Sequence, residues 1–366
     1  MKGLTFQRNG VVSVENVPEP TILRPDDAIV RVSMAGICGS DLHVLHAGEA
    51  FGFAPGARLG HEFLGTVEAV GSDVVSAAVG DRVLVSVSVN CGECSWCREG
   101  LQASCERMSM FGWAPRLWQH GGDVQGGQSE YARVPLANST LTRIPEAVAD
   151  PGREASLLPL IDVMSTAMHG LTAGRMQPGF HVVVIGDGAV GQSAVHCARA
   201  LGAEAVICLG HHADRLEMAE RLGASGVGEQ RDPEEIREFV FGATGGQGAH
   251  VVVDTVSNTS SMQGAHAAVR PGGTIACLGM DHFMGKLPEI NWYDQFVRNI
   301  TISGGLVHSN RYVGPLLELL ANDAIDPAPM LTNVLSLDDA AEGYRMMAER
   351  DPGVVKVALA VGAAGG

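Results

Sequence analysis

Residues 181–210 read HVVVIGDGAVGQSAVHCARALGAEAVICLG. The run of β-branched residues at the start predicts a strand, the glycines that follow predict a turn, and the remainder predicts a helix and a second strand. Strands and helices that alternate in this way indicate a parallel sheet, because the helix returns the chain so that the next strand runs in the same direction.

Further strands are predicted beyond this unit, each separated from the next by sequence that suits a helix. The candidates are residues 251–256, 274–279 and 300–305. They are apolar throughout and do not alternate with polar residues, which is typical of a sheet covered on both faces. A helical pattern over residues 157–174 precedes the first strand. We therefore predict an α/β fold whose Rossmann-type, doubly wound parallel sheet occupies residues 163–305.

The sequence on either side of this sheet has a different character. Short β-branched runs, broken by Gly, Pro and Asp, occupy residues 11–89 and predict an irregular, partly barrel-like β domain. Beyond residue 305 the pattern predicts two helices and a last strand, at residues 313–321, 337–348 and 354–361. Because 366 residues suit two domains, we expect residues 1–162 and 306–366 to form one mostly β domain, into which the Rossmann domain is inserted.

Composition and charge exclude several classes of function. The formal net charge is −16 at pH 7, and no run of Lys or Arg offsets it, so the surface should repel nucleic acid and anionic lipid. The first residues, MKGLTFQRNG, lack the apolar segment of a signal peptide, and no apolar stretch is long enough to span a membrane. We therefore expect a cytoplasmic protein that acts on a small molecule. In that reducing compartment its eight cysteines would more often bind metal than form disulfides.

Four of the cysteines lie in one loop, over about residues 90–106. They have the spacing C-x2-C-x2-C-x7-C and are Cys91, Cys94, Cys97 and Cys105. Four thiolates can form a closed tetrahedral shell, which suits a structural zinc ion that stabilises a loop too short to have its own core. An iron–sulfur cluster and free surface thiols are the alternatives, and the ligand count and spacing favour zinc.

The glycine turn of residues 181–210 indicates a dinucleotide site. Its G-x-G-x-x-G pattern directly follows a strand and begins a helix, so a pyrophosphate can approach the positively polarised helix N-terminus. The predicted contacts are Gly186, Gly188, Ala189, Val190 and Gly191.

The end of the second strand bears on which dinucleotide binds. An NAD enzyme places an acidic residue there against the ribose 2′-hydroxyl, whereas this chain has Gly210. The residues beyond it that can donate hydrogen bonds to a 2′-phosphate are His211, His212 and Arg215. We predict NADP as the cofactor. NAD, or use of both, stays open because histidines bind phosphate less firmly than arginine does.

A second group of potential ligands lies beside glycines at predicted strand ends. Cys38 stands in GICGSDLH, and His61 and Glu62 stand in GHEFLGTV. With VGDRV, the cysteine loop and the glycine turn, these segments resemble the zinc-containing medium-chain dehydrogenase/reductase family over nearly the whole chain. The resemblance implies a GroES-like catalytic domain, in which Cys38 and His61 are ligands of a catalytic zinc ion.

The third ligand is implied by the segment LLPLIDVMSTAMHG. It resembles a D-M-M-T-T-G-F-H-G type segment of bacterial secondary-alcohol dehydrogenases, which implies Asp162 as a ligand where many members have cysteine. An oxygen ligand should leave the zinc harder and more electrophilic. Glu62 is implied either as a ligand of the resting metal or as a hydrogen-bonding neighbour of it.

The resemblance also implies a mechanism. Zinc would act as a Lewis acid on the substrate oxygen during hydride transfer between NADP(H), or NAD(H), and an alcohol, ketone or aldehyde. Ser40 would bond the substrate oxygen, and His43 would pass the proton outward through the cofactor ribose. Asp41 could orient a metal-bound imidazole. Two zinc ions per chain are therefore expected.

The substrate pocket and the assembly state are implied less directly. Trp113 and His169 match segments that border the substrate in the secondary-alcohol branch, and an indole wall suits an apolar substrate. Core packing is the alternative for Trp113. The Gly-rich stretch 113–131 could form a pocket rim or a subunit contact. Both dimers and tetramers occur in the family, so we expect a homodimer or a homotetramer.

Two other functions compete with this interpretation. One is a zinc-independent quinone or enone reductase of the same fold, and the other is a nucleotide-binding protein without catalysis. The metal ligands Cys38, His61 and Asp162 argue against the first, and the proton path from Ser40 to His43 argues against the second.

Overall fold

The computed structural model describes residues 1–113, 124–279 and 289–362, and the chain divides into two compact units. The first unit consists of residues 1–162 and 308–366, and the second unit consists of residues 163–307. The second unit is thus an insertion in the sequence of the first.

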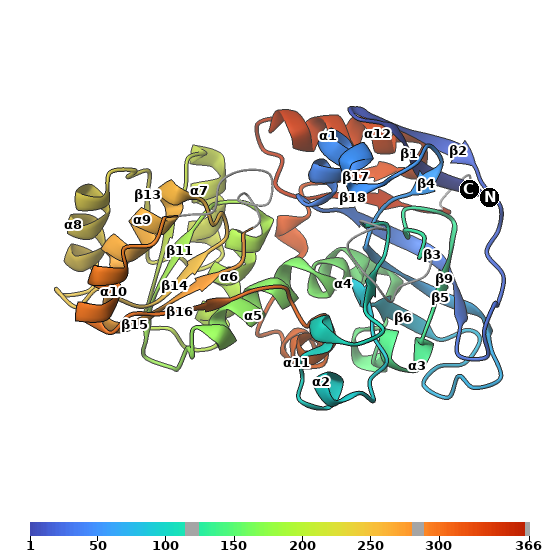
Figure 1. The fold of residues 1–366 in the computed structure, drawn as a ribbon, viewed down its shortest axis with the longest axis horizontal. Helices are drawn as coiled ribbons and strands as arrows, with labels where there is room; N and C mark the ends of the chain where they lie inside the picture. Colours follow the sequence, from blue (N-terminus) through green and yellow to red (C-terminus); the bar gives the residue numbers. More distant parts are fainter. Residues whose placement is uncertain (114–123, 280–288, 363–366) are drawn as a thin grey trace. The chain divides into compact units, whose positions relative to one another are not determined.

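The second unit contains a six-stranded sheet in the order β13-β12-β11-β14-β15-β16 (Figure 1), in which every pairing is parallel. Its strands are β11 (His181–Ile185), β12 (Ala205–Leu209), β13 (Gly226–Gly228), β14 (Ala249–Asp254), β15 (Val269–Cys277) and β16 (Thr301–Gly304). The chain proceeds outward from β11 to β13 and then crosses to β14 on the other side of β11. This reversal makes the carboxyl end of β11 a topological switch point, where such sheets bind ligands. The predicted doubly wound parallel sheet is confirmed.

Helices cover both faces of this sheet. On one face β14 packs against α5: a Cβ at Gly170 of α5 would lie 3.2 Å from Val253, and a Cβ at Gly174, just after the helix, would lie 2.3 Å from Val251. On the other face Val252 of β14 belongs to an apolar cluster that includes residues of α8 and α9. The helices of this unit are α5 (Val163–Ala173), α6 (Ala189–Ala200), α7 (Ala213–Arg221), α8 (Pro233–Ala243), α9 (Thr259–Ala268) and α10 (Trp292–Arg298). Burial on both sides explains why these strands are apolar throughout.

The first unit is built mainly on a seven-stranded sheet, in the order β10-β6-β5-β3-β18-β17 with β9 also paired to β3. Its strands are β3 (Ala28–Ile37), β5 (Glu62–Val70), β6 (Arg82–Val85), β9 (Tyr131–Val134), β10 (Leu141–Arg143), β17 (Asn333–Ser336) and β18 (Val357–Ala360). Two smaller sheets contain β1 (Lys2–Arg8), β2 (Val11–Asn16) and β4 (Ala57–Arg58), and β7 (Ser88–Val89) and β8 (Ser109–Met110). Because β18 pairs with β3, the main sheet combines strands from both sides of the inserted second unit.

The helical pattern over residues 157–174 corresponds to two helices, α4 (Glu154–Ile161) and α5, which are interrupted at Asp162. This residue has φ −124° and ψ −73°, outside the helical range. The remaining helices of the first unit are α1 (Asp41–Phe51), α2 (Ser95–Arg98), α3 (Ala137–Thr140), α11 (Ser309–Ala321) and α12 (Ala340–Glu349). Within the described ranges no helix combines the length and hydropathy that a membrane span requires.

Candidate metal and dinucleotide sites

Four potential metal ligands meet at the end of β3. Cys38 follows this strand, His61 and Glu62 lie at the start of β5, which pairs with β3 in the antiparallel direction, and Asp162 lies at the end of α4. One ligand atom from each residue lies within 4.8 Å of the others. Asp162 Oδ2 is 3.1 Å from Cys38 Sγ and 3.5 Å from His61 Nε2. The structure therefore brings together all the residues that the sequence suggested as ligands of a catalytic metal.

Residues at the start of α1 support this cluster. The Asp41 carboxylate accepts the N–H of Cys38 at 3.0 Å and lies 3.3 Å from His61 Nδ1, which leaves Nε2 facing the cluster. Ser40 Oγ is 3.3 Å from that Nε2. His43 is half-buried in the first turn of the same helix. Ser40 and Asp41 thus lie beside the cluster, and His43 lies further along α1.

Two buried residues that the sequence analysis did not single out extend this network. Gln128 Nε2 donates to the carbonyl of Gly36 at 2.8 Å and to Asp41 Oδ2 at 3.3 Å. The hydroxyl of Tyr344 in turn donates to Gln128 Oε1 at 2.9 Å. A hydrogen-bonded chain therefore runs from α12 to the carboxylate that orients His61.

A third such residue is Lys356, whose Nζ lies 2.5 Å from Glu62 Oε1. Both side chains are at most 1% exposed. Glu62 is also confined by Gly36, where a Cβ would lie 2.2 Å from Oε2. The sequence did contain a signal for a buried lysine, since a lysine is unusual within the apolar run VVKVALAV, but it did not indicate the partner.

The protonation equilibria of the cluster suit a bound cation. Burial raises the pKa of the Cys38 thiol to about 11, and the nearby Asp162 adds to the rise. Burial also raises the pKa of Glu62 to about 7, with Lys356 opposing and Asp162 reinforcing the shift. Burial thus disfavours the ionised forms of Cys38 and Glu62. A divalent ion would stabilise these ionised forms, and a sulfur, nitrogen and oxygen donor set with an imidazole fits zinc.

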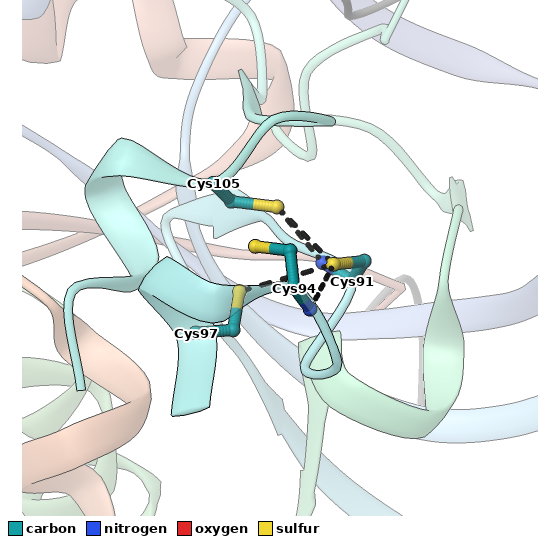
Figure 2. A group of neighbouring side chains, drawn as sticks. All are labelled: Cys91, Cys94, Cys97 and Cys105. Atoms are coloured by element: carbon teal, nitrogen blue, oxygen red, sulfur yellow. Dashed lines mark hydrogen bonds between the residues drawn. The ribbon is translucent and has the colours of Figure 1, made fainter. Parts of the chain in front are cut away.

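The second cluster is formed by Cys91, Cys94, Cys97 and Cys105, whose side chains converge in one loop (Figure 2). Cys91 Sγ is 3.5 Å from Cys105 Sγ and 3.9 Å from Cys97 Sγ. A tetrahedral zinc site with Zn–S bonds of about 2.3 Å has S···S edges of about 3.8 Å. Backbone N–H donors from Cys97 and Glu106 lower the pKa of Cys94 to about 6, which favours the thiolate that zinc requires. The compact spacing suits one ion better than a cluster of several irons.

The glycine turn lies between β11 and α6, and glycine suits each of its three positions for a different structural reason. Gly186 has φ +107°, which L side chains rarely adopt. A Cβ at Gly191 would lie 1.9 Å from the carbonyl oxygen of Gly186, so this position permits close packing of helix and turn. A Cβ at Gly188 would meet nothing within 4 Å. The space at Gly188, directly before Ala189 and Val190 of α6, suits the approach of a pyrophosphate.

The carboxyl end of β12 differs in one respect from the expectation. Gly210 follows the strand as predicted, but the carboxylate of Asp187, from the glycine turn, lies against it. Asp187 Oδ2 accepts the N–H groups of His211 at 2.6 Å and His212 at 2.9 Å. A Cβ at Gly210 would lie only 2.4 Å from this oxygen. An acid is therefore present at the strand end, and the sequence analysis missed it because it comes from another turn.

The two residues suggested for the substrate pocket are both buried. Trp113 is 5% exposed and packs against Phe51, with ring centroids 5.9 Å apart, and His169 lies in α5 of the second unit. Of the Gly-rich stretch 113–131, residues 114–123 lie outside the described ranges.

Comparison with known proteins gives consistent matches over most of the chain. Residues 24–146 match the family model of the alcohol dehydrogenase GroES-like domain, and residues 189–322 match that of zinc-binding dehydrogenases. A zinc-type alcohol dehydrogenase-like protein of Bacillus subtilis is 32% identical, over 98% of this chain and 100% of its own length.

Solved structures agree with these sequence matches. Alcohol dehydrogenase TADH from Thermus sp. ATN1 has a TM-score of 0.90 at 33% identity, covering 99% of this chain and 100% of that one. A zinc-binding dehydrogenase from Sinorhizobium meliloti bound to NADP has a TM-score of 0.80 at 29% identity, covering 98% of both chains. These similarities confirm the predicted combination of a GroES-like domain and a Rossmann-type sheet.

Proposed function

The chain belongs to the zinc-containing medium-chain dehydrogenase/reductase family of oxidoreductases, and from this premise we propose that it is a zinc-dependent alcohol dehydrogenase or carbonyl reductase. It would transfer a hydride between NADP(H) or NAD(H) and an alcohol, ketone or aldehyde. The observation that carries the proposal is the presence of two ligand clusters of different chemistry. One has four sulfurs and suits a closed structural site, and the other has mixed sulfur, nitrogen and oxygen ligands, which suits catalysis.

When bound by Cys38, His61 and Asp162, zinc supplies a Lewis acid that polarises the oxygen of the alcohol or carbonyl group. The side chains around the ligands perform the other tasks. Asp41 fixes the orientation of His61. Ser40 Oγ, 3.3 Å from His61 Nε2, is suited to exchange a hydrogen bond with the substrate oxygen. His43 is suited to carry the proton onward, because an imidazole can accept a proton at one nitrogen and donate one from the other.

The dinucleotide is proposed to bind at the glycine turn of the second unit. Support comes from the topological switch point at β11 and from the open space at Gly188. His211, His212 and Arg215 are the candidate donors to a 2′-phosphate, and the similar protein from Sinorhizobium meliloti is bound to NADP. Trp113 is proposed to contact an apolar portion of the substrate, and the role of His169 stays a prediction.

The decisive experiment combines metal analysis with a hydride-transfer assay. We expect about two zinc ions per chain, and oxidation of NADPH or NADH when ketones or aldehydes are supplied. A chelator should abolish turnover while about one zinc remains, because the four-sulfur shell has no open position. Full turnover in metal-free protein, or turnover only with quinones or enones, would contradict the proposal.

Self-association is proposed to use α10 and the edge strand β16. On α10, Trp292, Tyr293 and Phe296 are 69%, 79% and 80% exposed. Contiguous exposed aromatic surface on a folded protein usually marks an interface. Beside it β16 is the last strand of its sheet, so its outer edge can accept a strand from a second copy.

We expect Phe296→Glu to reduce the molar mass measured by light scattering, because it places a charge in the centre of this aromatic surface. Val75→Glu is the matched control, since Val75 is 89% exposed on the first unit and should not affect assembly. If the unchanged protein is a monomer at the concentrations used for catalysis, the proposed assembly is wrong.

A further inference from the structure

The carboxylate of Asp187 interacts with two basic side chains as well as with the backbone. Its Oδ2 lies 3.0 Å from His212 Nδ1, and its Oδ1 lies 3.7 Å from a guanidinium nitrogen of Arg215. Although burial by itself raises the pKa of Asp187, the N–H groups of His211 and His212 bring it below its ordinary value. The carboxylate is therefore ionised, and it offsets positive charge among the candidate phosphate donors.

A buried glutamine side chain fixes the backbone around this carboxylate. Gln192, which is fully buried in α6, donates from Nε2 to the carbonyl oxygens of Asp187 at 3.0 Å and Arg215 at 2.7 Å. The glycine turn and the start of α7 are thus connected through one side chain. The backbone of Asp187 is therefore fixed beside the start of α7.

In sheets of this type, the residues at the second strand end face the ribose of the adenosine half of the dinucleotide. We propose that Asp187 sets the choice of dinucleotide: it engages the His212 side chain, balances the charge of Arg215 and so limits the affinity for a ribose 2′-phosphate, which keeps NAD(H) acceptable beside NADP(H). In this view Gly210 makes room for a carboxylate from the glycine turn, and its lack of a side chain is not by itself a sign of NADP. The inference rests on the proposed dinucleotide site.

The physical argument concerns charge at close range. A 2′-phosphate carries nearly two negative charges, so a partly buried carboxylate beside it is strongly unfavourable. The same carboxylate also attracts the donors that would otherwise turn to the phosphate. Asp187→Asn has nearly the same shape, and its amide oxygen can still accept the N–H groups of His211 and His212. The substitution therefore removes the charge and keeps the hydrogen bonds of the turn.

Binding of two adenosine ligands by calorimetry tests this without zinc or turnover. The probes are adenosine 2′,5′-bisphosphate and adenosine 5′-monophosphate, which differ in the 2′-phosphate. We expect Asp187→Asn to tighten the bisphosphate by about tenfold or more and to change the monophosphate by less than about twofold. Arg215→Gln added to Asp187→Asn should cancel much of the gain, because the released guanidinium would provide it.

Glu217→Gln is the matched control, since it removes one negative charge from an exposed side chain of the same helix. It should leave the ratio of the two affinities unchanged. An unchanged ratio in Asp187→Asn would overturn the proposal. The proposal would also be overturned if Asp187→Asn and Asp187→Ser both failed to bind either adenosine probe. Asp187 would then be needed for the fold of the site and would not select between the two dinucleotides. If the unchanged protein binds neither probe, the proposed dinucleotide site itself is wrong.

Discussion

Asp162→Ala is expected to lower kcat/KM for alcohol oxidation by about a thousandfold or more. It removes one of the proposed ligands of the catalytic zinc, which are Cys38, His61 and Asp162. A Lewis acid at the reacting oxygen contributes several kcal/mol to transition-state stabilisation, and each 1.4 kcal/mol corresponds to about tenfold in rate. Zinc content should fall from about two ions per chain to about one. Dinucleotide affinity should stay largely the same, since the glycine turn belongs to the second unit. Elemental analysis, steady-state kinetics and nucleotide titration measure these three quantities.

Asp162→Cys provides the matched comparison. A thiolate is a good zinc ligand, so this variant should retain about two zinc ions and recover much of the activity that Asp162→Ala loses. Cys38→Ala removes another proposed ligand of the same zinc ion and should cause a similar loss of activity. Near-normal turnover in Asp162→Ala or Cys38→Ala with only the four-sulfur site loaded would refute the catalytic role of these ligands.

Lys356→Met is expected to reduce the free energy of unfolding of the first unit by about 3–5 kcal/mol, because Glu62 would remain buried without its partner. Urea titration gives this quantity. Lys2→Met is the control: Lys2 forms an ion pair with Asp338 whose side chains are 49% and 61% exposed, so this substitution should change the free energy of unfolding far less than Lys356→Met does.

The loss of unfolding free energy in Lys356→Met should also depend on pH. Burial already raises the pKa of Glu62 to about 7, and without Lys356 the pKa would rise further. A folded-state pKa above the unfolded value means that stability is lost as pH rises through it, so the defect should be larger at about pH 8 than at about pH 5.5. Adding Glu62→Gln should restore part of the stability. A defect that is small at both pH values would contradict the role of this ion pair.

Local sequence patterns were sufficient for the parallel sheet and the cysteine loop. The strands of the second unit are apolar because both faces are covered, and this pattern is visible without knowledge of the partners. The four cysteines lie within 15 residues of one another, so their spacing limits how far apart the thiols can be. The ligands Cys38, His61 and Asp162 are far apart in the sequence and were suggested by resemblance, not by spacing.

Interactions between distant residues could not be predicted. Lys356 and Glu62 are 294 residues apart, and Tyr344 and Gln128 are 216 apart, so only the pairing of β18 with β3 and the position of α12 bring them together. The interruption at Asp162 was also invisible, because the helical pattern continues through it. Asp187 was missed for a related reason. Its neighbours across the sheet depend on the register of β11 and β12.

The position of β18 beside β3 has a consequence for biosynthesis. Because the whole second unit lies between β3 and β18 in the sequence, the main sheet of the first unit cannot be completed until β18 has left the ribosome. The four potential ligands of the cysteine loop are close in the chain, so this site can acquire its metal during synthesis. The Glu62 carboxylate gains its compensating charge only after Lys356 has been synthesised. A nascent chain that ends before β18 would therefore contain all four cysteines of the loop, while the Glu62 carboxylate would still lack its partner.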